Sequence, residues 1–473
     1  MYAKNTKIVC TLGPSSDTLE KIVNLIHAGM NVARLNFSHG SHEHHAKLIK
    51  NIRKAEKISG KKIGILQDLQ GPKIRIGEMP KEGIELKNDK EFIITIRDVL
   101  GEEEKKEIII PIKYKNIVKD VKKNDIILIN DGLIEVKVIK VNKTQITCKV
   151  KSGGIVKKGH GVNLPTSSIS QKTITTKDRK DLTFGLKHNV DFVALSFVKS
   201  KKDIDELGKL IKKHKKDTAI IAKVERHEAV KNMREIIRSS DGVMVARGDL
   251  GADIAAEKVP IVQKSLISMA NKYGKPVITA THVLYSMIKK SRPTRAEISD
   301  AANAVYDHTD AIMLSDETAV GKYPVRATTT LTKVASAVER ELQKHQELLE
   351  IIDSQRKLST LNANCLNACE LAVDTKAHFI VTYTETGFTS RQISKHRLYI
   401  PILNIVSSEK IARELTLSWG LNRIFVHKIP KKLNKVKTIL EILKKEKAIK
   451  KGQKLVIVCN ANSKESIITT IKV

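Results

Sequence analysis

The feature that most constrains the fold is an alternation of strand-like and helical segments along most of the chain. Short apolar runs recur at regular intervals, and amphipathic stretches lie between them. A strand followed by a helix, repeated about eight times, is typical of a (β/α)8 TIM barrel, although the pattern alone also allows an open doubly wound sheet. We expect the barrel strands at residues 7–10, 32–37, 63–69, 192–197, 220–224, 243–246, 277–280 and 312–314.

The alternation is interrupted between residues 71 and 167, where the apolar pattern changes to a period of two. Turn residues such as Asn88-Asp89 and Ser152-Gly153-Gly154 separate the short runs. We therefore predict an inserted all-β barrel domain of antiparallel strands, which follows the third barrel strand. Such an insertion enters on the face where barrel active sites lie, so it could act as a lid.

A second, smaller α/β pattern begins after residue 341 and predicts a C-terminal α/β domain with a mostly parallel sheet. The predicted division gives residues 1–70 and 168–340 to the barrel, 71–167 to the inserted β-barrel domain and 341–473 to the C-terminal domain.

The charge balance is strongly basic, with 85 Lys and Arg residues against 52 Asp and Glu in 473 residues, a formal charge of +33. The lysines are spread over every segment and aromatic residues make up only 4%, so a nucleic-acid-binding surface is not favoured. The charge does predict attraction to phosphates and carboxylates.

The chain shows no apolar run long enough to span a membrane and no secretory signal, and none of its five cysteines forms a C-x-x-C pair. A reducing cytoplasmic location is therefore expected, without a membrane partner.

Polar side chains gather at the carboxyl ends of the expected strands. They are Arg34, Asn36, Ser38, Asp68, Lys223, Glu225, Arg247, Asp249, Thr279, Thr281, Ser315 and Glu317. Because residues i and i+2 of a strand share a face, the pairs should project together into the mouth of a barrel. Glu225 and Asp249 are hard oxygen ligands that suit Mg²⁺ better than zinc. Arg34 and Lys223 can neutralise a phosphoryl group, which is what phosphoryl transfer requires.

Several long motifs, in order, resemble those of the pyruvate kinase family. They are Thr11-Leu12-Gly13-Pro14, Asn31–Gly40, Asp68–Arg75, Gly161–Pro165, Ala222–Glu225, Met244–Gly251, Ile278–Met287, Pro293–Glu297 and Met313–Ala319. The resemblance covers residues 1 to about 335 closely and is looser beyond about 340. It implies a phosphotransferase of glycolysis that moves the phosphoryl group of phosphoenolpyruvate to ADP, giving pyruvate and ATP.

The resemblance also implies a role for each matching residue. Arg34 would grip the phosphoryl group, Lys223 would stabilise its charge, and Thr281 would lie near the methylene carbon that is protonated. Glu225 and Asp249 would hold Mg²⁺, or Mn²⁺ in its place. The backbone of Ala246, Arg247, Gly248 and Asp249 would bind the substrate carboxylate, and Arg75, Asn36 and His39 would bind the nucleotide.

Family members that require potassium bind it near the residues matching Asn36, Ser38, Asp68 and Leu69. This chain has Leu69-Gln70 and Lys73 where those members carry Thr-Lys and Glu, as does the branch that works without potassium. The ammonium of Lys73 could supply the missing positive charge. We expect potassium-independent activity.

Other positions depart from the family pattern, namely His160, His282, Tyr285 and Asp316. In the C-terminal domain, Thr384, Thr386, Gly387 and Thr389 resemble the family's effector phosphate loop. The Gly-rich segment that usually completes that site is replaced by Asn460–Glu465. A bisphosphate effector is therefore not expected, and the C-terminal domain would serve regulation or the interfaces of a homotetramer.

Three alternatives stay open from the sequence. One is another Mg²⁺-dependent enolate or pyruvate barrel enzyme, one a basic nucleic-acid-binding protein, and one a catalytically lapsed relative. The nucleotide-directed Arg75 and the inserted domain favour the kinase over the first of these.

Overall fold

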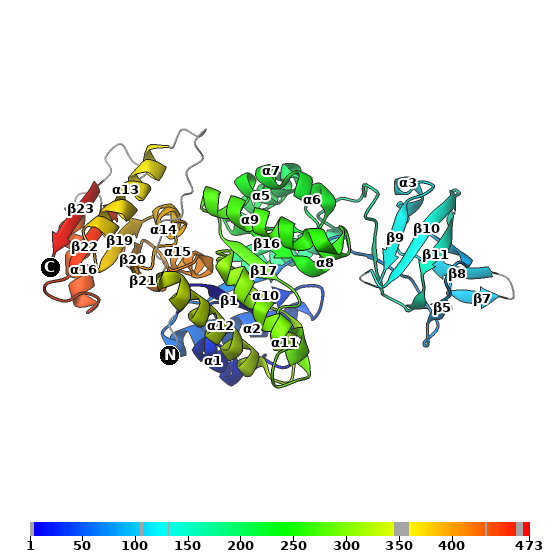
Figure 1. Ribbon diagram of the computed structural model, residues 1–473, viewed down its shortest axis with the longest axis horizontal. Coiled ribbons are helices and arrows are strands. Elements are labelled where there is room, and N and C mark those ends of the chain that lie inside the picture. The colour runs from blue at the N-terminus through cyan, green and yellow to red at the C-terminus, as the bar shows by residue number, and fades with distance from the viewer. Residues whose placement is uncertain (1–3, 105–106, 131, 345–358, 431–432, 460–466) are drawn as a thin grey trace.

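The computed structural model describes residues 4–473 apart from 105–106, 131, 345–358, 431–432 and 460–466. The described residues form three units in a row, with the inserted unit at one end, the barrel in the middle and the C-terminal unit at the other end (Figure 1). Much of the helical stretch expected after residue 341, and the segment 460–465, lie outside the described residues.

Eight parallel strands close into a barrel, as the strand–helix alternation predicts. Neighbouring strands pair in parallel throughout, and the last strand pairs with the first, with Ile8 opposite Ile312. The closed ring rules out the open doubly wound sheet. The strands are β1 (Lys7–Thr11), β2 (Val32–Asn36), β3 (Gly64–Asp68), β14 (Phe192–Leu195), β15 (Ala219–Val224), β16 (Gly242–Ala246), β17 (Val277–Ala280) and β18 (Ala311–Leu314).

The barrel has two apolar layers because its strands are buried on both faces. Val9, Val32, Leu66, Met244 and Ile278 belong to a cluster that fills the inside of the barrel. Alternate residues of the same strands pack outward against the helices in a second, larger cluster. The interior is therefore a packed core, and side chains become accessible only at its mouths.

Five of the helices around the barrel begin where the sequence supplies a capping residue. The side chains of Thr18, Ser41, Thr175, Ser200 and Thr294 each accept a hydrogen bond from a backbone N–H in the following turn. The helices are α1 (Leu19–Ala28), α2 (His42–Ser59), α4 (Thr176–Lys187), α5 (Lys201–Lys213), α6 (His227–Lys231), α7 (Met233–Ser239), α8 (Arg247–Gly251), α9 (Val259–Tyr273), α10 (Arg295–Tyr306), α11 (Asp316–Ala319) and α12 (Pro324–Lys344), with single 3₁₀ turns η1 (Ala256–Lys258) and η2 (Tyr285–Ile288).

The inserted unit is a curled sheet with its own apolar core. Its strands lie in the order β4-β13-β9-β10-β11-β6-β8-β7. Ile76, just beyond β4, forms a bridge with Ile112, just beyond β8. This bridge joins the two sides of the sheet and closes the sheet into a barrel. The elements are β4 (Ile74–Arg75), β5 (Ile84–Leu86), β6 (Glu91–Thr95), β7 (Glu102–Glu104), β8 (Glu107–Pro111), α3 (Ile117–Asp120), β9 (Ile126–Ile129), β10 (Ile134–Val141), β11 (Gln145–Ser152), β12 (Gly154–Val156) and β13 (Gly161–Asn163).

One pairing in this unit differs from the expected all-antiparallel arrangement. Strands β6 and β8 run parallel, with Ile93 opposite Ile109. The long connection between them contains β7, which pairs with β8 as a hairpin, so β8 can return in the same direction as β6. A period of two identifies a strand but not the direction of its neighbour.

The C-terminal unit has a five-stranded sheet in the order β21-β20-β19-β22-β23. Four strands are parallel, as predicted, and β23, which the sequence analysis missed, pairs antiparallel with β22 at the edge. The elements are α13 (Thr360–Asp374), β19 (Phe379–Thr384), α14 (Phe388–Ser394), β20 (Ile402–Val406), α15 (Glu409–Glu414), η3 (Leu415–Leu417), β21 (Arg423–Val426), α16 (Lys435–Lys445), β22 (Lys454–Cys459) and β23 (Ile467–Lys472).

A buried ion pair joins the C-terminal unit to the barrel. The guanidinium of Arg397 contacts both carboxylate oxygens of Asp310, at 3.1 and 2.9 Å, and Asp310 also accepts a hydrogen bond from the backbone of Trp419. The expected boundary after residue 340 falls inside α12, which continues to Lys344 as one helix.

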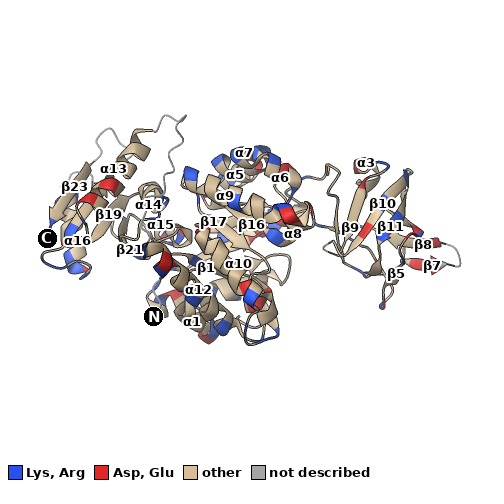
Figure 2. Cartoon of the chain, viewed as in Figure 1, with Lys and Arg blue, Asp and Glu red and all other residues tan. Residues whose placement is uncertain are grey.

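Basic side chains are distributed over all three units rather than gathered in one stripe (Figure 2). Within the described part of the chain, no helix is both long and apolar enough to cross a bilayer.

Candidate active site

Three strands bring Arg34, Asp68 and Lys223 together at the mouth of the barrel. Arg34 donates from Nε to Oδ2 of Asp68 over 2.8 Å, and Lys223 Nζ lies 3.3 Å from Oδ1 of the same carboxylate. All three residues are at most 9% exposed. Burial opposes the charge of Asp68, but Lys223 and Arg34 outweigh it, so the pKa of this carboxyl lies below its usual value. The carboxylate holds two cations side by side.

Lys223 also contacts Glu225, two residues along the same strand end. Its Nζ lies 2.8 Å from Oε1 of Glu225 and donates a 2.8 Å hydrogen bond to Ser196. Burial alone would lower the pKa of Lys223, but Asp68 and Glu225 raise it above its usual value. The ammonium therefore stays charged at the mouth of the barrel.

Glu225 is the most buried of the predicted metal ligands, at 1% exposure. Its Oε2 accepts a 2.6 Å hydrogen bond from the backbone of Phe197, whereas Oε1 accepts no well-aligned hydrogen bond from the described residues. Burial, together with the charge of Asp249, raises the pKa of Glu225 above its usual value, although Lys223 opposes the shift. A carboxylate in this state gains from a bound cation.

Asp249 reaches the same region from the next strand. In the pairing of β15 with β16, Val224 lies opposite Val245. Glu225 therefore lies level with the end of β16, and Asp249 follows in the next element, α8. Oδ1 of Asp249 accepts a 2.9 Å hydrogen bond from Lys73, which precedes β4 of the inserted unit. The charge of Asp249 therefore acts on Glu225, the other carboxylate expected to hold a metal, and Lys73 pairs with Asp249.

Arg247 does not project beside Asp249 as the strand spacing suggested. β16 ends at Ala246, and residues 247–251 form a helical turn in which positions i and i+2 diverge. The Arg247 guanidinium instead binds Asp300 at 2.6 Å and the backbone oxygen of Thr281 at 2.9 Å. Its side chain fixes the neighbouring loop, so only its backbone remains available for a substrate.

Thr281 has a left-handed backbone, with φ of 67°, and His282 follows with φ of 53°. A positive φ at a β-branched residue is a strained conformation that tends to occur at functional sites. The hydroxyl of Thr281 accepts a 2.7 Å hydrogen bond from the backbone N–H of Gly248 and donates to the oxygen of Ala280. This joins Thr281 to the α8 turn.

Thr279 and Glu317, from the strand-end pairs of β17 and β18, make hydrogen bonds within the protein. Thr279 is fully buried and bonds to Thr309, so it faces away from the mouth. Glu317 accepts hydrogen bonds from the backbones of Ser315 and Leu284 and holds two loops together. The departures at Asp316, His282 and Tyr285 lie around these loops, and the rings of His282 and Tyr285 contact edge to face.

The predicted nucleotide residues lie on both sides of the junction with the inserted unit. Arg75, in β4, donates a 2.9 Å hydrogen bond to the oxygen of Gly159, next to His160. Asn36 ends β2, and its side chain accepts from the backbone of Ser38. The backbone oxygen of His39 contacts the ring of His45. Each residue has a local partner, and Asn36 and Arg75 come from different units.

Two residues that the sequence analysis did not assign complete the network. Thr11 accepts a 2.9 Å hydrogen bond from Nη1 of Arg34, and Ser196 donates a 2.7 Å hydrogen bond to the oxygen of Leu69. Both are hydroxyl residues at or just beyond the end of an expected strand, which is the signal that could have identified them.

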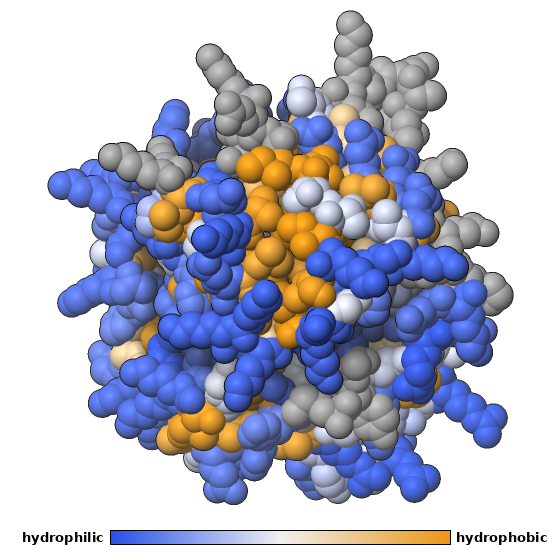
Figure 3. Space-filling view, turned by 90° about the vertical axis from the view of Figure 1, so that its left-hand side faces the viewer, coloured by the Kyte–Doolittle hydropathy of each residue, from blue (hydrophilic) through white to orange (hydrophobic). Residues whose placement is uncertain are grey.

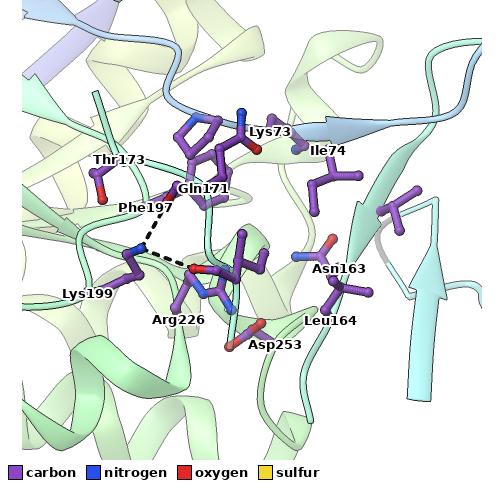
Figure 4. A pocket seen from close by; sticks show the side chains of 13 residues that line it. Lys73, Ile74, Asn163, Leu164, Gln171, Thr173, Phe197, Lys199, Arg226 and Asp253 are labelled. Atoms are coloured by element: carbon purple, nitrogen blue, oxygen red, sulfur yellow. Dashed lines mark hydrogen bonds between the residues drawn. The ribbon is translucent and has the colours of Figure 1, made fainter. Parts of the chain in front are cut away.

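A cavity lies where the chain crosses between the barrel and the inserted unit, with a volume of about 460 Å³, part of it open to solvent (Figure 4). Six of the residues that line it are Lys73, Asn163, Phe197, Lys199, Arg226 and Asp253. Lys73 and Phe197 also contact Asp249 and Glu225, so the cavity adjoins the acidic pair. It includes neither Arg34 nor Lys223.

His227, Glu228 and Asp253 form a second group with metal-ligand chemistry, their ligand atoms within 4.8 Å of one another. His227 already contacts Asp253 through its ring and its backbone N–H, and Arg226 contacts Glu228 at 2.7 Å. These contacts satisfy the group internally.

The effector-like loop lies between β19 and α14. Gly387 has φ of 75° and caps α14, and Thr384 and Thr389 are buried. The hydroxyl of Thr386 accepts from the backbone of Phe388 at 3.4 Å. The segment 460–465, which would face this loop in the family, lies outside the described residues.

Two models of protein families match this chain and show which family it belongs to. One described as "Pyruvate kinase, barrel domain" matches residues 3–328, and one described as "Pyruvate kinase, alpha/beta domain" matches residues 362–473. The chain belongs to the pyruvate kinase family. Pyruvate kinases of Geobacillus stearothermophilus and Bacillus licheniformis are 44% and 45% identical over 421 residues, which is 88% of this chain and 71% of each relative.

A solved pyruvate kinase structure from Cryptosporidium parvum is also similar, with a TM-score of 0.90 at 36% identity. The match covers 99% of this chain and 96% of that one. Pyruvate kinase membership makes the chain a phosphotransferase, as the motifs predicted. It favours the kinase over the alternative barrel enzyme and the nucleic-acid-binding protein.

Proposed function

We propose that the chain transfers the phosphoryl group of phosphoenolpyruvate to ADP at the mouth of the barrel. The observation that carries this is the placement of Arg34 and Lys223 on one carboxylate, Asp68, with Glu225 and Asp249 alongside. Two cations and two acids provide the charges that phosphoryl transfer between anions requires.

Arg34 and Lys223 act on the phosphoryl group while it is transferred. The P–O bond to the enol oxygen breaks, a bond to a β-phosphate oxygen of ADP forms, and the enolate carbon takes up a proton. Arg34 and Lys223 are buried and already oriented by Asp68, so they stabilise the transferred charge without having to reorganise. Lys223 stays protonated because Asp68 and Glu225 raise its pKa.

Glu225 and Asp249 would hold Mg²⁺, or Mn²⁺ in its place. Their oxygen chemistry fits these ions, and Oε1 of Glu225 is buried without a well-aligned hydrogen bond. When bound there, the ion would supply positive charge that stabilises the anionic substrate. Because the ion would repel the ammonium of Lys73, we expect Lys73 to leave Oδ1 of Asp249 when the ion binds.

The α8 turn and Thr281 would bind the rest of the substrate. The backbone N–H groups of Ala246, Arg247, Gly248 and Asp249 lie at the end of β16. The side chain of Arg247 donates a hydrogen bond to the backbone oxygen of Thr281 and so holds the Thr281 loop in place. We place the methylene carbon near Thr281, whose hydroxyl is held between Gly248 and Ala280. Arg75, Asn36 and His39 would bind the ADP phosphates, and the inserted unit would exclude water.

We further propose that activity does not need potassium. Lys73 brings a positive charge to the mouth of the barrel, where it contacts Asp249. In potassium-dependent members the cation binds near the residues that match Asn36, Ser38, Asp68 and Leu69. A tethered ammonium at this mouth can replace a freely bound monovalent ion.

The remaining proposals concern assembly and location. We propose a homotetramer, supported by the apolar patch on the outward face of the C-terminal unit (Figure 3), at the end of the molecule that carries β23. We propose a cytoplasmic location, because all five cysteines are free and buried. We propose a monophosphate as the most that the Thr384–Thr389 loop can bind.

The test is the release of pyruvate from phosphoenolpyruvate by the purified chain. We expect that pyruvate release requires both ADP and Mg²⁺ and that ATP forms in an equal amount. Pyruvate release without ADP, or no ATP despite pyruvate, would refute it.

A further inference from the structure

A second cavity lies where the C-terminal unit docks on the barrel, away from the proposed catalytic residues. It has a volume of about 180 Å³, part of it open to solvent. The barrel contributes Lys275 and Asp310, and the C-terminal unit contributes Arg391, Lys395, Arg397 and Ser418. The cavity is therefore formed by both units.

The charges around the cavity are unbalanced. Four of its lining residues are cationic, and among the described lining residues Asp310 is the one carboxylate. Asp310 is already committed, because both its oxygens contact Arg397 and its Oδ1 accepts from the backbone of Trp419. The cations from the two units therefore face one another with little negative charge between them.

The pKa values of Lys275 and Arg391 reflect mainly their burial. Burial lowers the pKa of Lys275, Asp241 opposes the shift, and the charge of Arg391 lowers it further. Burial also lowers the pKa of Arg391, although Glu414 and Asp241 oppose the change. Both acids act from outside the lining, so cations from two units remain close together in a partly buried place.

Two hydrogen-bonding groups of the lining have no partner. Nε of Arg397 and Oγ of Ser418 bond to none of the described residues, although the two residues are 4% and 2% exposed. The other nitrogens of Arg397 are occupied by Asp310, Asn271 and the oxygen of His308. A buried donor without a partner is costly, and an acceptor in the cavity would satisfy it.

The barrel and the C-terminal unit pack closely beside the cavity. Gly274 has φ of 62°, and a Cβ there would lie 2.3 Å from the side chain of Gln392, so α14 sits directly against the end of α9. The cavity is also distinct from the effector-like loop, because Thr384, Thr386 and Thr389 do not line it. Arg391 connects the two places through a 3.3 Å hydrogen bond to the oxygen of Thr386.

We propose that this cavity binds one small tetrahedral oxyanion, either free phosphate or the phosphoryl group of a phosphate monoester, between the barrel and the C-terminal unit. The anion accepts hydrogen bonds from Lys275 on one side and from Arg391 and Arg397 on the other. It removes the repulsion between the two units, so its binding stabilises their junction.

Isothermal titration with inorganic phosphate tests the proposal. The full chain carries Arg34→Met throughout, so that the proposed catalytic mouth has lost a phosphate-binding cation. We expect saturable binding of one phosphate, weakened at least about tenfold by Lys275→Met or Arg391→Met, because each removes a charged hydrogen bond. The exposed Lys437 on α16 supplies the control, and Lys437→Met keeps the affinity.

Two results would overturn the site: no saturable phosphate binding, or equal affinity in all four proteins. Selenate soaked into crystals of the unchanged chain gives a test that does not depend on variants. Its anomalous peak is expected between Lys275 and Arg391, and a peak only at the barrel mouth contradicts the proposal. Competition of phosphate with glycerol 3-phosphate distinguishes a monoester ligand, which displaces phosphate, from free phosphate, which the ester leaves in place.

Discussion

Lys73, just before the first strand of the inserted unit, donates a hydrogen bond to Asp249 at the mouth of the barrel, with 2.9 Å between Nζ and Oδ1. This contact links the two units through one of the proposed metal ligands. Lys73 thereby brings a tethered positive charge beside a carboxylate that we propose as a metal ligand.

Replacing Lys73 tests whether its ammonium substitutes for potassium. In Lys73→Glu the positive charge is lost, so we expect low activity in tetramethylammonium buffer and a rise of about tenfold or more when KCl is added. The measurement is the rate of pyruvate formation against potassium concentration. The matched control is Lys113→Glu, which lies in the inserted unit and makes an exposed ion pair with Glu78. The idea fails if unchanged chain is already potassium-dependent.

Glu225→Gln removes a charge from the proposed metal site while keeping its shape. We expect turnover to fall by at least about a hundredfold, with a higher Mg²⁺ requirement, because the loss of a charged ligand weakens the metal. Steady-state rates at several Mg²⁺ concentrations measure both effects. Glu228→Gln, three residues along the chain, should keep its Mg²⁺ requirement. Equal behaviour of the two variants would contradict the assignment.

The buried pair between Asp310 and Arg397 should dominate the stability of the barrel–C-terminal junction. Asp310→Asn leaves a buried guanidinium without its counter-charge, which costs about 3–5 kcal/mol. Lys62→Met, by contrast, removes an ion pair with the half-exposed Glu409 at the same junction and should cost less than about 1 kcal/mol. Urea denaturation compares them. Similar midpoints for both variants would show that burial of the pair adds nothing.

His396 makes stability depend on pH. Burial, helped by the charge of Lys395, lowers the pKa of His396 from 6.5 to about 4. Between these values the unfolded chain binds a proton that the folded chain does not, so stability is complete above pH 6.5 and falls as the pH drops towards 4. One such histidine contributes a slope of about 1.4 kcal/mol per pH unit.

His396→Leu should remove the share of the slope that His396 contributes and leave the share of His308, whose pKa burial also lowers to about 4. His27→Gln, at an exposed position on α1, should keep both shares. Urea midpoints at pH 7, 6 and 5 measure the difference. A variant with the slope of the unchanged chain would show that His396 does not carry the effect.

Much of the fold was predictable because its signals are local. The barrel strands are continuous apolar runs, and residues such as Thr175 and Ser200 mark helix starts by their capping chemistry. The break between α6 and α7 at Asn232 and the edge strand β23 have no such local signal. Both depend on packing rather than on a local pattern.

The site was predictable only in part. Arg34, Asp68, Lys223 and Glu225 meet because the closed barrel brings the ends of three strands together. Arg247 and Thr281 differ because the chain leaves the strand conformation just before them, so a spacing of two no longer defines a face. The pairing of Lys73 with Asp249 spans two units and has no signal in either motif.

The most direct test of the account is the position of Mn²⁺ in crystals of the chain grown with oxalate, a mimic of the pyruvate enolate. We predict one anomalous peak coordinated by oxygens of Glu225 and Asp249, with Lys73 displaced from Oδ1. A peak at His227, Glu228 and Asp253 instead, with the first pair empty, would contradict the proposed active site.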